Sequence, residues 1–195
     1  MKKVSFTLLF SAILVLSGCK NDKNADDTTS PAETNQTTQN TEREEVRKIT
    51  VTIEPKSGSN LSGNAVFSEE NGQVTMTAII DGLSEGMHAI HLHESADCSA
   101  QDGSSAGGHW NPTAEKHGKW GDASGYHRGD IGNFKVDANG NGTITKTTDQ
   151  WCIGCDDQNK NIVGKSLLIH DGVDDFTSQP AGDAGTRVGC GSIRM

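Results

Sequence analysis

The chain has 195 residues, of which 32% are hydrophobic, and its 17 basic and 26 acidic residues give a formal net charge of -9. This length suits one domain with appendages. The acidic balance argues against nucleic acid as a partner, because such binding depends on Lys and Arg side chains that neutralise phosphates. A hydrophobic content this low often indicates disorder, but 23 Gly and seven His are not a disorder composition. We therefore expect something besides a large apolar core to stabilise the fold.

Residues 1–18 have the organisation of a secretory signal. Lys2 and Lys3 precede a short apolar run, and Leu-Ser-Gly follows it directly before Cys19. The Leu-Ser-Gly-Cys sequence resembles a bacterial lipobox, which implies that Cys19 is lipidated and anchors the chain to a membrane. The alternative is an ordinary signal peptide followed by an unmodified cysteine. No further apolar run is long enough for a transmembrane helix, so we expect no spanning segment.

Residues 19–45 consist almost entirely of polar residues such as Asn, Asp, Thr and Gln. Such a segment buries too little apolar surface to offset the entropy of ordering, and we expect a disordered tether. Residues 46–195 then form the single folded domain. The signal and lipobox together predict an exported cell-envelope lipoprotein, periplasmic or anchored in the outer membrane.

Eight short strands are expected in this domain, because β-branched residues alternate with polar ones and turn signals such as Asp81-Gly82 separate the runs. The expected strands cover residues 46–54, 64–67, 73–80, 87–93, 131–136, 143–148, 165–170 and 187–193. Two long Gly-rich connections remain, at residues 94–130 and 171–186, and connections of this length in a compact domain are usually functional or held in place by something else. The pattern predicts an all-β fold, an antiparallel sandwich or flattened barrel.

All seven histidines lie between positions 88 and 170. His91 and His93 alternate on an expected strand, so their rings project from one face and can bind one metal, although an alternating pair on a solvent face is the alternative. The other candidate ligands lie in the first long connection or at the end of a later strand: His109, His117, His127, Asp130 and His170. Imidazoles suit copper and zinc, and three imidazoles with one carboxylate suit zinc. The set predicts two adjacent metal sites, one all-nitrogen and one containing Asp130.

Several motifs, in order, resemble those of the copper/zinc superoxide dismutases. His-Ala-Ile-His-Leu-His-Glu at 88–94 resembles the copper-strand motif of this family, and Gly-His-Trp-Asn-Pro at 108–112 resembles its bridging-histidine motif. Gly-Asp-Ile-Gly-Asn at 129–133 resembles the end of the zinc loop. Leu-Ile-His at 168–170 and Gly-Thr-Arg-Val-Gly-Cys-Gly at 185–191 resemble the C-terminal signature. The resemblance covers essentially the whole domain and implies a Greek-key, immunoglobulin-like fold.

The resemblance also implies the cofactors and the activity, which is dismutation of superoxide to dioxygen and hydrogen peroxide in protection of the cell envelope. Copper would be held by His91, His93, His109 and His170, and zinc by His109, His117, His127 and Asp130. His109 would bridge the two ions, with copper cycling and zinc structural. The rival hypothesis is a non-catalytic metal-binding or adhesion module, and a copper store is a weaker one. The rivals are disfavoured because all four copper positions are histidine and Arg187 is present.

Three further residues have roles implied by the resemblance. Arg187 resembles the arginine that orients the superoxide anion, with a surface salt bridge as the alternative. Asp174 resembles the carboxylate that hydrogen-bonds one ligand of each metal, here His91 and His117, with a simple turn cap as the alternative. His88 resembles a buried structural histidine and is not expected to be a ligand. A homodimer is left open.

Four cysteines remain after Cys19, an even number in an exported protein. Cys98 and Cys190 resemble the disulfide of the family. Cys152 and Cys155 depart from the family motifs. We expect a short structural disulfide between them, and a third metal site or a reactive thiol pair are the alternatives.

One other departure concerns substrate guidance. The second long connection contains no Lys or Arg, so Lys116, Lys119 and Arg128 of the first connection are the candidates for local positive charge.

Overall fold

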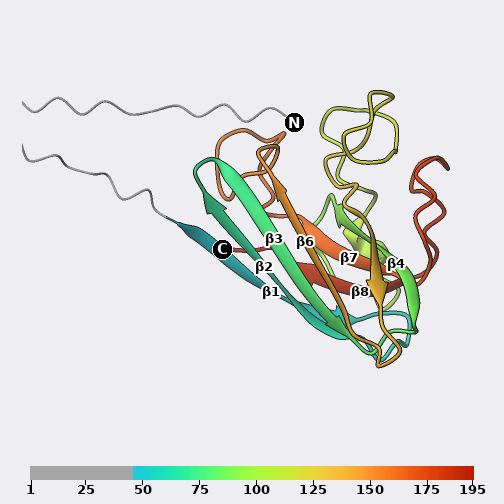
Figure 1. The fold of residues 1–195 in the computed structure, drawn as a ribbon. Helices are drawn as coiled ribbons and strands as arrows, with labels where there is room; N and C mark the ends of the chain where they lie inside the picture. Colours follow the sequence, from blue (N-terminus) through green and yellow to red (C-terminus); the bar gives the residue numbers. More distant parts are fainter. Residues whose placement is uncertain (1–45) are drawn as a thin grey trace, which may run out of the picture. The chain divides into compact units, whose positions relative to one another are not determined.

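The computed structural model describes residues 46–195, which fold into a closed antiparallel β-barrel (Figure 1). The signal, the lipidation site Cys19 and the tether predicted for residues 1–45 lie outside the described residues. The eight strands are β1 (Arg47–Pro55), β2 (Ser62–Glu70), β3 (Gln73–Asp81), β4 (Gly86–His93), β5 (Gly132–Val136), β6 (Gly142–Thr148), β7 (Ser166–His170) and β8 (Arg187–Ser192). Their order around the barrel is β1-β2-β3-β6-β5-β4-β7-β8. The expected all-β fold of about eight antiparallel strands is confirmed.

The strand boundaries differ little from the expected ones, and the largest difference is at β2, which extends to both sides of the expected residues 64–67. Its end pairs with β3 up to Glu70 opposite Gln73, across a two-residue Asn71-Gly72 turn. Both turn residues have positive φ, 52° for Asn71 and 70° for Gly72. Such turns match the twist of paired strands, so the hairpin continues through residues whose polarity does not predict a strand.

The barrel interior is filled by the alternating apolar residues of the strands. On β1 the buried positions are Ile49, Val51 and Ile53, and every residue between them is exposed. This alternation places one face of β1 in the core and the other in solvent. Each fully buried aliphatic side chain of this kind contributes about 1.5–3 kcal/mol.

Strands β4 and β7 are buried on both faces, unlike β1. Ile90 and Leu92 of β4 belong to the main core, whereas His91 and His93 lie on the opposite face. The long connections at 94–131 and 171–186 contribute the residues that meet this opposite face. The fold therefore builds a buried polar layer between the barrel wall and two loops.

Among residues 46–195 the one helical segment is the three-residue 3-10 turn η1 (Ser104–Ala106). In this described range no helix reaches the length and apolar character that crossing a membrane requires.

Candidate metal centre

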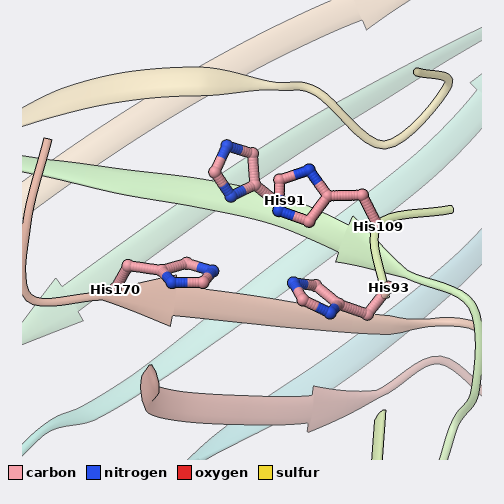
Figure 2. A group of neighbouring side chains, drawn as sticks. All are labelled: His91, His93, His109 and His170. Atoms are coloured by element: carbon pink, nitrogen blue, oxygen red, sulfur yellow. The ribbon is translucent and has the colours of Figure 1, made fainter. Parts of the chain in front are cut away.

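Four histidine rings gather on the covered face of β4 and β7 (Figure 2). His91 and His93 come from β4 and His170 from the end of β7. His109 comes from the first long loop, which is held against β4 by a bridge between His93 and His109. One donor atom from each ring lies within 4.8 Å of the others, and all four residues are buried. We call this set the four-histidine cluster.

Hydrogen bonds fix one nitrogen of each ring in this cluster. His93 Nδ1 is 2.9 Å from Gly107 O, and His170 Nδ1 is 3.4 Å from Gly185 O. His91 Nε2 is 2.9 Å from Asp174 Oδ2, and His109 Nδ1 is 2.8 Å from Asp130 Oδ1.

The other nitrogen of each ring has no hydrogen-bond partner although it is buried: Nδ1 of His91 and Nε2 of His93, His109 and His170. A buried polar atom without a partner costs about 1–3 kcal/mol, so four of them in one place call for a ligand. Four converging imidazole nitrogens suit copper or zinc, and the residues therefore fit a metal ion.

The protonation states also suit metal binding. Burial lowers the pKa of His109 to about 4, with the neighbouring charge of His91 contributing. Burial likewise lowers the pKa of His170 to about 3 and that of His93 well below its usual value. These rings are neutral at pH 7, so their free lone pairs are available to a cation.

A second set, the zinc-type cluster, consists of His109, His117, His127 and Asp130. Asp130 Oδ2 accepts backbone N–H groups of His127 at 2.8 Å and Gly118 at 3.1 Å. His117 Nδ1 lies 3.0 Å from Oδ2, and His127 Nδ1 lies 3.2 Å from Oδ1. Neither nitrogen has hydrogen-bond geometry, which is the arrangement expected when donor atoms surround a shared ion. Three imidazoles and one carboxylate fit zinc.

The carboxylate of Asp130 is ionised. Burial opposes its charge, but the three adjacent rings of His109, His117 and His127 and the backbone N–H of His127 hold its pKa well below the usual range. His109 belongs to both clusters, since its Nδ1 faces Asp130 and its Nε2 faces the four-histidine cluster.

Asp174 connects the two clusters. Its Oδ2 is 2.9 Å from Nε2 of His91, and its Oδ1 is 2.9 Å from Nε2 of His117. The pKa of Asp174 lies below its usual range despite burial, because both rings hydrogen-bond to it. Burial disfavours the charge on His117, but Asp130 and Asp174 together raise its pKa to about 9. The structure therefore has both hydrogen bonds that the resemblance implies for Asp174.

Only glycine fits at position 182, next to the Asp174–His117 contact. Gly182 has φ of 66°, and a Cβ there would collide with the Asp174 carboxylate and with Nε2 of His117.

Arg187 lies at the edge of the four-histidine cluster. Its guanidinium donates to the carbonyls of Gly103 and Gly107, each at 2.8 Å. The carbonyl of Gly107 also pairs with His93 Nδ1. No ion pair of Arg187 is found among residues 46–195, so the salt-bridge alternative has no support there.

Both expected disulfides are present. Cys98–Cys190 joins the first long loop to β8 across a sequence separation of 92, and Cys152–Cys155 closes a separation of 3.

Two site residues are absent from the sequence-based interpretation. Gln179 of the second loop accepts from the backbone N–H of His117 at 3.0 Å and donates to its carbonyl at 2.9 Å. Asn133 of β5 makes the same paired contact with the backbone of Asp174, at 2.8 Å each way. Both side chains hold a site residue in place. Asn133 falls inside the motif at 129–133, but nothing in the local sequence distinguishes either amide from the others.

Residues 61–193 match the family described as copper/zinc superoxide dismutase (SODC). This chain belongs to the copper/zinc superoxide dismutase family. The family uses copper and zinc, and the two clusters provide donor sets suited to them.

Curated members of the copper/zinc superoxide dismutase family align with most of the domain. The chain is 36% identical over 135 residues to copper/zinc superoxide dismutase 2 of Aquifex aeolicus, covering 68% of this chain and 78% of the relative. It is 34% identical over 146 residues to copper/zinc superoxide dismutase 5 of Dictyostelium discoideum, covering 71% and 93%. It is 33% identical over 139 residues to the extracellular enzyme of Caenorhabditis elegans, covering 68% of this chain and 61% of that longer protein.

Solved structures agree with this superoxide dismutase family assignment. A double mutant of a SOD-like protein from Bacillus subtilis aligns with TM-score 0.66 and 27% identity, covering 75% of this chain and 97% of that chain. The clock protein EA4 aligns with TM-score 0.65 and 29% identity, covering 74% and 92%.

Proposed function

We propose that this chain is an exported enzyme that converts two superoxide anions and two protons into dioxygen and hydrogen peroxide. In this proposal the four-histidine cluster holds copper and the zinc-type cluster holds zinc. The observation that carries it is the placement of His109, which presents one ring nitrogen to each buried donor set. A ring shared in this way links an all-imidazole site to a site with a carboxylate.

Copper, when bound, supplies one-electron redox chemistry because it has two accessible oxidation states, whereas zinc has none. The protein supplies the proton path. Nε2 of His109 faces the four-histidine cluster and has no other partner. When this nitrogen is free of metal it can take a proton and hold it beside the place where superoxide is reduced to hydrogen peroxide. Nδ1 stays directed at Asp130, so the ring keeps its orientation throughout.

Arg187 is the proposed binding residue for the superoxide anion. Its two hydrogen bonds to Gly103 and Gly107 fix the guanidinium next to His93. A fixed cation beside the redox site orients an anion and raises its local concentration.

The rival function is a metal-binding module without catalysis. Four buried imidazoles with unpartnered donor nitrogens and a fixed arginine beside them favour the enzyme. The test is the rate of superoxide decay with the full chain loaded with copper and zinc. We expect fast decay for the parent and none above background for His91→Ala, with Asp122→Ala, an exposed residue of the first loop, behaving like the parent. Metal uptake without superoxide decay would refute the proposal.

The proposed cellular site is the envelope. Two disulfides suit an oxidising compartment, and one relative carries the name extracellular. We propose that residues 1–18 are a lipoprotein signal, residues 19–45 a tether beginning at lipidated Cys19, and residues 46–195 the enzyme domain that protects the envelope from superoxide. Fractionation of cells that express Cys19→Ser tests this: the variant should leave the membrane fraction, and continued membrane association would contradict it.

A further inference from the structure

The two loop histidines of the zinc-type cluster are separated by residues 118–126, which we call the excursion. His117 and His127 are buried, but most of the residues between them are exposed, including Lys119 and Asp122. Two local turns shape it, with Asp122 N–H donating to Lys119 O at 2.9 Å and Gly125 N–H donating to Asp122 O at 3.2 Å, so its attachment to the barrel depends on other contacts. Among the residues that are not exposed, Trp120 and Tyr126 carry aromatic side chains, and both are partly buried.

These two aromatic rings pack against the barrel. The Trp120 centroid lies 5.1 Å from Tyr126 and 5.6 Å from Trp151, the latter at an interplanar angle of 83°. Trp151 follows β6 and is 1% exposed, so it is part of the core. The Tyr126 hydroxyl is 3.0 Å from the side chain of Gln150. Aromatic pairs at such distances and angles are attractive beyond the area they bury.

A lysine also contacts the ring of Trp120. Lys146 of β6 places Nζ 3.8 Å from the centre of the Trp120 ring. Burial lowers the pKa of Lys146 to about 8, so the amine is still charged at pH 7. No ion pair of Lys146 occurs in the part of the chain that the structure describes, and the indole face is its observed contact. A cation over an indole is a favourable interaction.

Trp151 also holds the far end of the excursion. Its indole Nε1 donates to the carbonyl of Arg128 at 2.9 Å, directly after His127. Trp151 is in turn followed by the Cys152–Cys155 disulfide, which closes the adjoining turn. His117, at the near end, is held separately by Gln179 and Asp174.

We propose that Trp120, held in place by its contacts with Lys146 and Trp151 (the clamp), is a positioning residue that preorganises His127 and the excursion for zinc and slows the loss of the ion. This inference rests on the zinc assignment in the proposed function. Without the clamp, the excursion must lose conformational freedom each time zinc binds, which weakens binding. Removal of a contact that orients a metal ligand typically weakens the affinity for the metal about 10–100-fold.

The test is the rate at which the zinc-loaded full chain releases zinc to a chromophoric chelator at pH 7. We expect Trp120→Ala to release zinc about tenfold faster or more, and Lys146→Met about fivefold faster. Trp120→Phe should restore most of the parent rate, since it keeps an aromatic face. Lys135→Met, an exposed lysine on β5, should match the parent.

Two further measurements separate positioning from general destabilisation and from a wrong zinc site. Copper retention should change little in Trp120→Ala, although the metal-free chain should melt at a lower temperature because an aromatic contact with the core is lost. A parent-like zinc release rate in Trp120→Ala overturns the clamp, as does a loss of copper equal to the loss of zinc. Asp130→Ala tests the zinc assignment itself: if that variant retains zinc like the parent, the assignment is wrong. If it loses zinc while Trp120→Ala does not, the clamp alone is wrong.

Discussion

Replacing Asp174 with alanine is expected to weaken both metal sites at once. The carboxylate is buried and lies 2.9 Å from one ring nitrogen of His91 and 2.9 Å from one of His117. Each ring must keep its proton on the nitrogen facing Asp174 so that the other nitrogen, which has no protein partner, can bind metal. Asp174 thus selects the metal-binding tautomer in one ligand of each cluster.

The size of the effect follows from these two contacts. Loss of a partner that orients a ligand typically costs about 10–100-fold in metal affinity, which corresponds to about 1.4–2.8 kcal/mol for each ion. The variant also leaves two buried ring N–H groups unpaired, and at about 1–3 kcal/mol each these lower the free energy of unfolding by about 2–6 kcal/mol. Asp174→Asn keeps the volume and one acceptor oxygen, so we expect an intermediate loss.

Competition with chelators of known affinity measures copper and zinc binding separately, and urea unfolding measures stability. Asp175→Ala is the matched control, because Asp175 is exposed and its side chain bonds only within its own turn, to Thr177 and Ser178. Parent-like affinities in Asp174→Ala would show that the carboxylate does not orient the metal ligands. A loss confined to one ion would refute the claim that Asp174 connects the clusters.

Three other predictions concern the disulfides, pH and the arginine. Cys98→Ser opens a loop with a sequence separation of 92 and should lower the free energy of unfolding by about 4–5 kcal/mol, whereas Cys152→Ser opens a separation of 3 and should cost about 2 kcal/mol; equal losses in urea would contradict this. In the metal-free chain the pKa of His109 is about 4 rather than 6.5, so the unfolded state takes up the proton first, and up to about 3 kcal/mol of stability should be lost as pH falls from 6.5 to 4. A melting temperature that does not change between pH 6.5 and 4 would count against the burial of a neutral His109 ring. Arg187→Ala should reduce kcat/KM for superoxide roughly tenfold or more with copper content unchanged, and an unchanged rate would show that the guanidinium does not guide the anion.

The strands are predictable from the sequence wherever burial alternates along one element. Ile49, Val51 and Ile53 show this on β1, because strand geometry alone sends alternate side chains to opposite faces. The ends of β2 are not predictable in this way. Glu69 and Glu70 are polar, and they belong to the strand because the Asn71-Gly72 turn continues the pairing.

The residues of the candidate site are likewise predictable only where their placement depends on local sequence. Spacing on one strand is local information, and it suffices to place His91 and His93 on one face. Which distant residues meet them depends on tertiary pairing, so residue patterns predict two donor sets while the family resemblance is needed to partition them. The roles of Gln179 and Asn133 could not be predicted from the sequence. A loop or strand amide has no local signature that shows which backbone it holds.

Anomalous diffraction from crystals of the metal-loaded chain, recorded at the copper and zinc absorption edges, shows directly which residues hold each ion. We expect a copper peak among His91, His93, His109 and His170, and a separate zinc peak among His109, His117, His127 and Asp130, with the His109 ring between the two. A single peak, or a copper peak that does not contact His109, would contradict it.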